Sequence, residues 1–328
     1  MTTTRHALLG TAKRRFPRHH PAVPNGLYRV LLGAAVLVFA ALLVALVVDL
    51  VYQAEPAFAH FGIGFVTGTA WNPVKVQYGA FPFIMGTLET TVIAMVLAIP
   101  IGLGTALALA YLLPYGTRSV LGTAVELLAA IPSVVYGLWG LLVVAPWART
   151  IIEPAVGFVF GHSGPGSGPE IGIGLLLAGL ILFVMVLPTM VAISRDVLAA
   201  VPADQVEGAI ALGATRWQTL WRVVVPHART GLLGAVTLSV GRAFGETMAV
   251  AMIIGNTPAL AHSLFSTTAT MASIIANQFT EAEEPYHLAV LIAIAVLLLV
   301  ISVIVNVAAR LLVRAVGRSR TSTSIAVA

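Results

Sequence analysis

The chain has 328 residues, of which 59% are hydrophobic and 9% are charged, whereas soluble proteins carry roughly 25% charged residues. This composition excludes a soluble globular protein and indicates a membrane protein with several spans. The net charge of +5 does not indicate a nucleic-acid partner, because the basic residues cluster beside apolar runs. The chain has no cysteine, which excludes disulfides and thiolate metal sites.

The amino-terminal residues 1–29 carry basic side chains and no acid, and we expect a disordered cytoplasmic tail. The uncharged run 30–48 is long enough to cross about 30 Å of hydrocarbon. A cleaved signal peptide is the alternative, since Ala57-Phe58-Ala59 resembles a cleavage site. Its apolar region would exceed the usual length of about 7 to 15 residues, which favours a retained span. Residues 53–82, rich in glycine, proline and aromatic residues, predict an external loop.

Five further apolar runs predict membrane spans at residues 83–113, 121–146, 171–193, 231–254 and 288–309. We therefore expect an all-α protein with six transmembrane helices, which places both termini on one side. Lysine and arginine concentrate in the segments that are cytoplasmic if the amino terminus is inside, and the other segments are richer in glutamate. The expected organisation is a basic cytoplasmic tail (1–29), a transmembrane domain (30–313) and a second basic cytoplasmic tail (314–328).

A polar stretch at residues 201–226 interrupts the apolar sequence between the fourth and fifth predicted spans. Asp204 and Glu207 have the spacing of a capping box and predict a helix that begins at Asp204. Gly213 predicts the end of that helix, because glycine readily adopts the left-handed conformation that closes many helices.

Thr215 and Gln218 repeat the capping pattern and predict a second helix. This helix carries Trp217 and Trp221, and Pro226 is expected to interrupt it. A compact polar hairpin within a lipid-soluble chain predicts contact with a protein partner in water.

The hairpin resembles the EAA loop of ABC importer permeases, which reads Glu-Ala-Ala, three residues, Gly, nine residues, Ile-x-Leu-Pro. The matching positions, with both gaps preserved, are Glu207, Gly208, Ala209, Gly213, Val223, Val225 and Pro226. Gly208 replaces an alanine of the pattern, and two valines replace larger aliphatic residues. In that family the loop is a coupling helix in a groove of the cytoplasmic ATPase, so Glu207, Gly208, Ala209 and Gly213 are implied to dock there. An ordinary amphipathic hairpin is the alternative.

Further stretches resemble the phosphate-specific (Pst) importer permeases of the PstC type. Residues 241–250, GRAFGETMAV, are similar to their fifth span, with Phe244 where a smaller aliphatic residue is expected. Residues 130–140 resemble their third span, and residues 86–91 their second. The likeness runs from about residue 71 to residue 250, and it implies a type I permease fold and ATP-driven import of inorganic phosphate.

The resemblance also implies partner chains. These are a second, homologous permease of the PstA type, two copies of an ATPase of the PstB type, and an external phosphate-binding protein of the PstS type. ATP and Mg are expected on the ATPase, because a Walker A loop needs Gly-Lys-Ser/Thr and neither Lys13 nor Lys75 lies in such a sequence. The glycine-rich segment 161–169 is interpreted as a flexible external linker. We expect no cofactor and no metal site in this chain.

Arg242 lies about halfway along the predicted fifth span, where an arginine costs roughly 2.5 to 3.5 kcal/mol to insert and should therefore face a polar interior. Its guanidinium group suits phosphate oxygens. Glu246, four residues later, is expected on the same helical face, where it neutralises Arg242 until an anion replaces it. A purely structural pair that joins helices is the alternative.

Thr87 and Thr90 offer hydroxyl groups to the same substrate path, although a threonine in a helix also bonds its own backbone, which is the favoured interpretation for each. Glu89 and Glu126 lie nearer the ends of their predicted spans and are interpreted as interfacial or helix-contact groups. One arginine among three glutamates does not form an anion path, so the second permease is expected to supply further donors. Residues 257–286 predict an external connection with a small helix at the membrane surface near 271–276.

The sequence thus predicts a multi-pass permease subunit in the lipid bilayer of a prokaryotic cell membrane, which imports phosphate and has no catalytic residues. A permease for sulfate or molybdate is the nearest alternative, because one arginine does not discriminate among oxyanions. The EAA-like loop argues against an ATP-independent channel. A membrane-embedded enzyme is disfavoured, because the sequence offers no nucleophile with a base and an orienting group.

Overall fold

The computed structural model describes residues 25–160, 171–282 and 284–318. The predicted linker at 161–169 and most of both predicted tails lie outside these ranges. The chain divides into two units, Met1–Val48 and Asp49–Ala328. The described part of the first unit is the beginning of helix α1, and all the other elements belong to the second unit.

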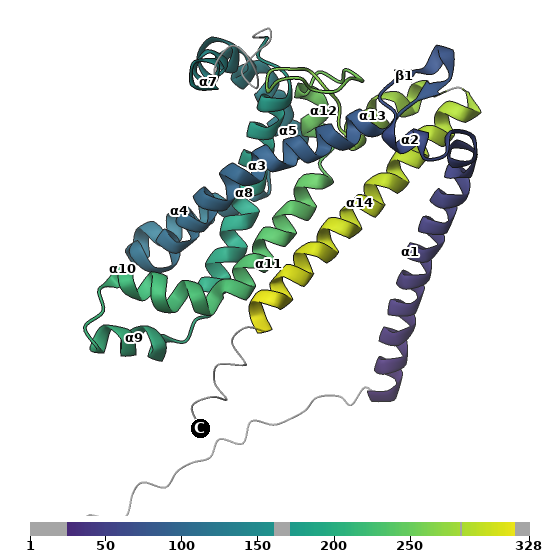
Figure 1. Cartoon of the computed structure of the whole chain (residues 1–328). Coiled ribbons are helices and arrows are strands. Elements are labelled where there is room, and N and C mark those ends of the chain that lie inside the picture. Colours follow the sequence, from purple (N-terminus) through teal and green to yellow (C-terminus); the bar gives the residue numbers. More distant parts are fainter. Residues whose placement is uncertain (1–24, 161–170, 283, 319–328) are drawn as a thin grey trace, which may run out of the picture. The chain divides into compact units, whose positions relative to one another are not determined.

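The described elements follow one another as helices and short turns, with one small hairpin of strands (Figure 1). In chain order they are α1 (Asn25–Phe61), α2 (Gly64–Thr67), β1 (Trp71–Asn72), η1 (Pro73–Lys75), β2 (Gln77–Tyr78), α3 (Phe81–Leu107), η2 (Ala108–Leu112), α4 (Tyr115–Ala129), α5 (Ser133–Trp139), η3 (Gly140–Val144), α6 (Ala145–Trp147), η4 (Ala148–Ile152), α7 (Glu153–Phe160), α8 (Leu175–Ala199), α9 (Ala203–Ala211), α10 (Arg216–Thr219), η5 (Leu220–Val224), α11 (Val225–Phe244), α12 (Met248–Ile253), α13 (Met271–Gln278), η6 (Phe279–Glu281) and α14 (Pro285–Arg318). Turns η1 and η6 are 3-10 helical, and η2 to η5 are π-helical. The fold is therefore helical, as predicted, apart from the two-residue strands.

Six helical stretches within the described residues are long and apolar enough to cross a membrane, which confirms the predicted number of spans. They are Gly26–Phe61, Phe81–Leu112, Ser133–Phe158, Leu175–Ala199, Arg216–Phe244 and Pro285–Leu311. The second, fourth and sixth lie close to their predicted positions. The third and fifth are displaced, because breaks in the backbone divide the apolar runs at places that composition does not mark.

The third span begins at Ser133, so the prediction of a single span over 121–146 is wrong. Pro132 disfavours the helical conformation of the residue before it, and α4 accordingly ends at Ala129. A new helix starts at α5 and continues through the π-helical turns η3 and η4 into α7. The apolar run at 121–146 thus contains the whole junction between two helices.

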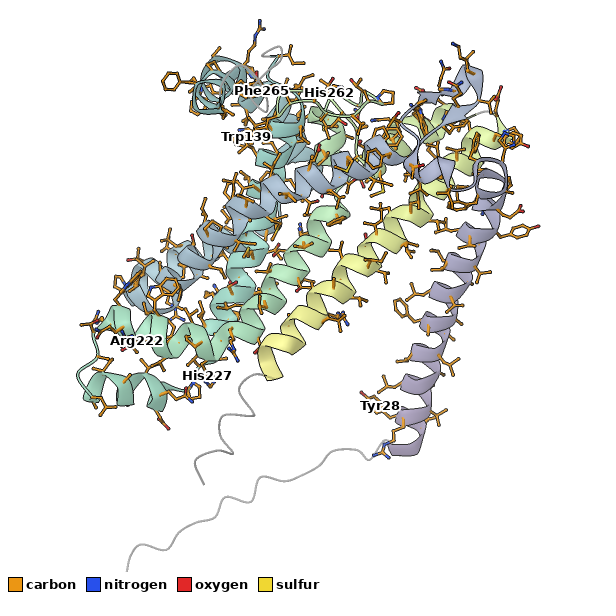
Figure 2. All side chains as sticks on the ribbon, in the orientation of Figure 1. Tyr28, Trp139, Arg222, His227, His262 and Phe265 are labelled. Atoms are coloured by element: carbon orange, nitrogen blue, oxygen red, sulfur yellow. The ribbon has the colours of Figure 1, made fainter. Side chains whose placement is uncertain are left out.

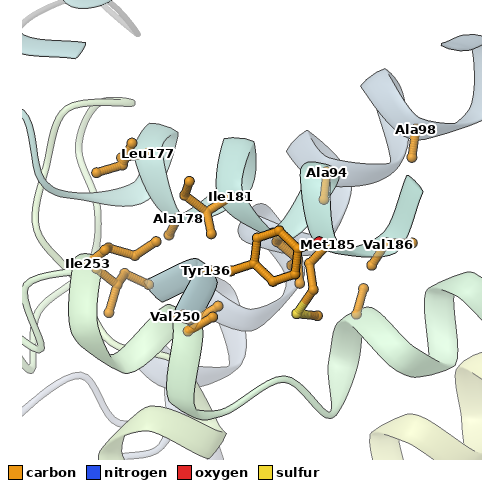
Figure 3. Packing of buried hydrophobic residues seen from close by; sticks show 14 of the residues in the cluster. Ala94, Ala98, Tyr136, Leu177, Ala178, Ile181, Met185, Val186, Val250 and Ile253 are labelled. Atoms are coloured by element: carbon orange, nitrogen blue, oxygen red, sulfur yellow. The ribbon is translucent and has the colours of Figure 1, made fainter. Parts of the chain in front are cut away.

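The main core lies where α5 and α12 pack against α8. Figure 3 shows the ring of Tyr136, from α5, among Ile181, Met185 and Val250. The hydroxyl group of the buried Tyr136 has a hydrogen-bond partner, because it donates to the carbonyl oxygen of Leu128 at 2.8 Å. The core therefore holds both halves of the broken α4–α5 segment to the same helix.

The predicted external loop at 53–82 is largely structured instead. Helix α1 continues to Phe61, and α2 and the β1–β2 hairpin follow it. The ring of Trp71 lies 5.0 Å from that of Tyr78 and 4.8 Å from that of Phe83, and its Nε1 donates to Oε1 of Gln278 at 3.2 Å. These long-range contacts order the segment, and the glycine and proline content of the sequence does not reveal them.

The small helix expected near 271–276 is α13, Met271–Gln278. Its first turn is buried, and the backbone N–H of Met271 donates to Oγ1 of Thr87 in α3 at 3.0 Å. Gly86 permits this approach, since a Cβ atom there would lie 2.3 Å from the carbonyl oxygen of Ala269. The connection after α12 is thus part of the packed structure.

We expect Gly86→Ala to lower the stability of the protein by about 1 to 3 kcal/mol, because the new methyl group meets backbone that cannot move aside. Gly104→Ala in the same helix is the matched control, because a Cβ atom there has nothing within 4 Å. The control should leave stability unchanged or raise it by up to ~1 kcal/mol through helix propensity. Thermal unfolding of the detergent-solubilised variants measures both, and equal midpoints would contradict the prediction.

Candidate functional site

The polar stretch at 201–226 forms a helical hairpin, α9 followed by α10, at one end of the second unit (Figure 1). Figure 2 labels Arg222 and His227 at this end, and His262 and Phe265 at the opposite end. The hairpin is therefore separated from α12, α13 and the β1–β2 hairpin by the length of the spanning helices.

Helix α9 begins one residue before the predicted start, at Ala203. Pro202 is the N-cap residue, with φ −58° and ψ 131°, and no side chain caps the helix. The predicted capping box of Asp204 and Glu207 is therefore wrong. The fixed φ of proline starts the helix early, and Asp204 stands in the first turn, where its charge interacts favourably with the helix dipole.

The turn and the second helix start agree with the prediction. Gly213 has φ +86°, and its N–H donates to the carbonyl oxygen of Ile210 at 2.9 Å. The capping box of Thr215 and Gln218 is present: the Gln218 N–H donates to Thr215 Oγ1 at 3.2 Å, and the Thr215 N–H donates to Gln218 Oε1 at 2.9 Å. These local bonds define the turn and the start of the second helix.

Pro226 does not interrupt the second helix, contrary to the prediction. Helix α10 continues through the π-helical turn η5 into α11, with Pro226 in the first turn of α11. A π-helical turn is wider than an α-helical one, so the missing N–H and the ring of proline are accommodated. One unbroken helical path therefore leads from the hairpin into the fifth span.

The hairpin exposes apolar as well as polar side chains. Leu212 is 91% exposed and Trp217 63% exposed, and the ring of Trp217 makes an edge contact with that of Trp221 at 5.5 Å. Glu207 and Gly208 are exposed, and Ala209 is half-buried. Sequence reasoning missed Leu212, although a large apolar residue beside the turn glycine is a usable signal. Together these residues form a surface suited to a protein partner.

Charged residues of other helices gather at the same end. Arg118 of α4 and Glu207 line one pocket of about 250 Å³ at the base of α9. Arg195, near the end of α8, forms an ion pair with Glu126 of α4 at 3.1 Å and a second with Asp196 at 3.0 Å. Glu126 thus connects α4 to α8, which is the helix-contact role that the sequence predicted as one of two possibilities.

The fifth span breaks after Phe244, shortly beyond Arg242. Helix α11 ends at Phe244 and α12 begins at Met248, so Glu246 stands in the break and does not share a helical face with Arg242. The Glu246 carboxylate accepts the backbone N–H of Ala249 at 3.1 Å. Both residues are described, no ion pair joins them, and Arg242 is exposed. The predicted neutralising pair is therefore wrong, because the carboxylate caps α12 instead.

Thr87 and Thr90 are both 2% exposed and face neighbouring backbone. Thr87 Oγ1 donates to Phe83 at 2.8 Å, and Thr90 Oγ1 donates to Gly86 at 2.8 Å, each to a carbonyl oxygen one turn earlier. Both hydroxyl groups thus bond their own helix, which is the favoured interpretation of these threonines, and that of Thr87 also accepts the N–H of Met271 in α13. Glu89 differs, since its Oε2 is buried without a hydrogen-bond partner beside a pocket of about 560 Å³.

Residues 98–318 match the family described as binding-protein-dependent transport system inner membrane component. Three relatives are phosphate transport system permease proteins PstC. The protein of Mesorhizobium japonicum is 39% identical over 88% of this chain and 90% of its own length. That of Pasteurella multocida is 42% identical over 83% and 87%. PstC 1 of Mycobacterium tuberculosis is 38% identical over 82% and 87%.

Solved structures with low sequence identity share the fold. A chain of the inward-facing MetNI methionine ABC transporter is 23% identical, with a TM-score of 0.54 over 70% of this chain and 93% of its own. A chain of a bacterial alginate ABC transporter in complex with its periplasmic protein is 16% identical, with a TM-score of 0.56 over 88% and 96%. This chain belongs to the inner membrane components of binding-protein-dependent transport systems and, among them, to the PstC-type permeases.

Proposed function

We propose that the chain forms half of the translocation path of an ATP-driven importer of inorganic phosphate. The PstC proteins of three organisms, each about 40% identical over more than four fifths of this chain, support phosphate as the substrate. The observation that carries the mechanism is the exposed α9–α10 hairpin, which continues as one helix into the span that contains Arg242.

We propose a type I permease fold with both termini in the cytoplasm. The distribution of basic residues supports this orientation, because the α9–α10 hairpin carries Arg216 and Arg222 and the last span ends near Arg310. The hairpin is then cytoplasmic, whereas α13 and the β1–β2 hairpin face the external side. The organisation into two basic tails and a transmembrane domain at 30–313 remains part of this proposal.

The hairpin docks onto a partner ATPase of the PstB type, present in two copies, which hydrolyses ATP with Mg. Glu207, Gly208, Ala209 and Gly213 are the proposed coupling positions, and exposed Leu212 and Trp217 add apolar contact area. The helical path from Arg216 to Phe244 is 29 residues long and spans roughly 40 Å at 1.5 Å per residue. Movement of the docked hairpin therefore reaches the middle of the membrane through a stiff element.

Arg242 lies at the far end of that path and is exposed on this chain, so a second permease of the PstA type can complete the surroundings of its guanidinium group. An external binding protein of the PstS type delivers phosphate to the opposite side. ATP binding favours one of two permease conformations, which closes the inner gate while the outer gate opens. Arg242 offers donors to the phosphate oxygens during passage.

Uptake of labelled phosphate by phosphate-starved cells tests the proposed function. We expect uptake to disappear when the chain is deleted, to return with its restoration, and to persist in excess sulfate. Sulfate that abolishes uptake would instead indicate a broader oxyanion permease, and uptake that ignores the deletion would contradict phosphate import by this chain.

We expect Glu207→Arg to abolish uptake and ATPase co-purification, because it reverses the charge at the proposed docking surface, while the chain still inserts into the membrane. Gln205→Arg is the control, since it also places an arginine on α9, about 200° around the helix from Glu207. Pull-down of the ATPase with each tagged variant measures the effect. Full recovery of ATPase with Glu207→Arg would remove Glu207 from the coupling surface.

We expect Arg242→Gln to lower phosphate uptake about tenfold with the complex intact, because a charged donor to the anion is lost. Arg149→Gln is the matched control, since Arg149 lies at the proposed external end of the third span. Uptake per amount of assembled complex is the measurement. A normal rate for Arg242→Gln would show that Arg242 has a structural role instead.

A further inference from the structure

Asn306 is a polar residue in the most apolar of the six spans. An 18-residue stretch of the span Pro285–Leu311 has a mean hydropathy of 3.5, above the corresponding values in the other five spans. Between His287 and Arg310 its polar side chains are Ser302 and Asn306. A polar side chain within a membrane span is costly when it faces lipid, and it usually faces protein or a water-filled path.

The amide group of Asn306 lies against α11, which packs beside α14 (Figure 1). A Cβ atom on Gly241 would be 3.5 Å from Oδ1 and 3.6 Å from Nδ2 of Asn306, so the amide is in contact with the backbone at this glycine. Gly241 directly precedes Arg242. The structure thus places the amide of α14 at the depth of the arginine that the proposed function assigns to the path.

The hydrogen bonds of Asn306 leave part of the amide available. Nδ2 donates to the carbonyl oxygen of Ser302 at 2.9 Å, and the described residues provide no further partner for the second N–H or for Oδ1. Asn306 is half-buried, so its side chain is partly accessible. An asparagine amide can donate and accept at the same time.

The carboxylate of Glu246 does not pair with Arg242. Glu246 is held toward α12 by the N–H of Ala249, and no ion pair between described residues neutralises Arg242. The break after Phe244 also leaves Gly245 exposed, so the backbone around it is accessible to a polar ligand. A neutral amide next to Gly241, the residue before Arg242, is compatible with an anion, whereas a carboxylate in that place would repel it.

We propose that Asn306 contacts the transported anion beside Arg242, an inference that rests on the proposed function. The guanidinium group of Arg242 donates to the charged oxygens, and the free N–H of Asn306 donates to another oxygen. Its Oδ1 accepts the hydroxyl proton that hydrogen phosphate carries. Sulfate at neutral pH has no such proton, so the amide favours a protonated tetrahedral oxyanion.

Asn306→Leu tests the proposal, because leucine has a similar volume, suits an apolar helix and lacks the amide. We expect labelled phosphate uptake in starved cells to fall about tenfold, as for the loss of one hydrogen bond to a charged group. Membrane content, co-purification of the ATPase and ATP hydrolysis by the purified complex should be unchanged. Asn306→Gln keeps an amide and should recover part of the uptake, and Ser302→Ala on the same face should transport normally.

Normal uptake by Asn306→Leu overturns the inference. If Asn306→Leu does not assemble, Asn306→Ala replaces it: reduced uptake by an assembled complex supports the contact, whereas normal uptake or a second failure to assemble assigns Asn306 to packing and overturns it. Failure of the unmodified chain to restore uptake overturns the proposed function and the inference with it. Restored uptake together with a normal Asn306→Leu variant overturns the inference alone.

Discussion

The close contact between α3 and α8 is the interaction on which the rest of the structure depends. Small residues permit it: a Cβ atom on Gly179 would lie 2.4 Å from Cγ2 of Ile93, and one on Gly102 would lie 3.2 Å from the side chain of Met190. Apolar side chains gain little by leaving lipid for protein, so helices in a membrane associate through such close packing. Helices α4, α5, α11 and α12 all contact α8, and α13 contacts α3. Elements at both ends of the second unit therefore pack against the α3–α8 pair.

Backbone hydrogen bonding explains where the spans bend and break. A peptide group in the bilayer needs a partner, so irregular backbone is tolerated where protein supplies one. The turn before Pro226 widens into a π-helical turn and keeps the path from the hairpin continuous. In the break after Phe244, the Glu246 carboxylate accepts the backbone N–H of Ala249 and so gives that peptide group a partner. A continuous helix toward the hairpin and a polar break after Phe244 therefore occur in the same span.

Charged groups within the spans also need partners, and the structure provides them in different ways. Arg195 is held by Glu126 and Asp196, and both carboxylate oxygens of Glu153 accept the N–H of Gly172, at 3.1 and 3.2 Å. Arg242 differs, because no carboxylate pairs with it within the described residues. This contrast distinguishes the charged groups that are paired within the described structure from Arg242, which is not.

The sequence by itself determined the number of spans, the turn at Gly213, the capping box at Thr215 and the family, because each depends on composition, local bonding or residue order. Only the tertiary structure decided the positions of the third and fifth spans, the burial of Thr87 and Thr90, and the direction of the Glu246 carboxylate. Apolar runs look alike whether a helix continues or breaks within them. A side chain four residues away shares a face only if the helix persists, and that depends on packing between distant segments.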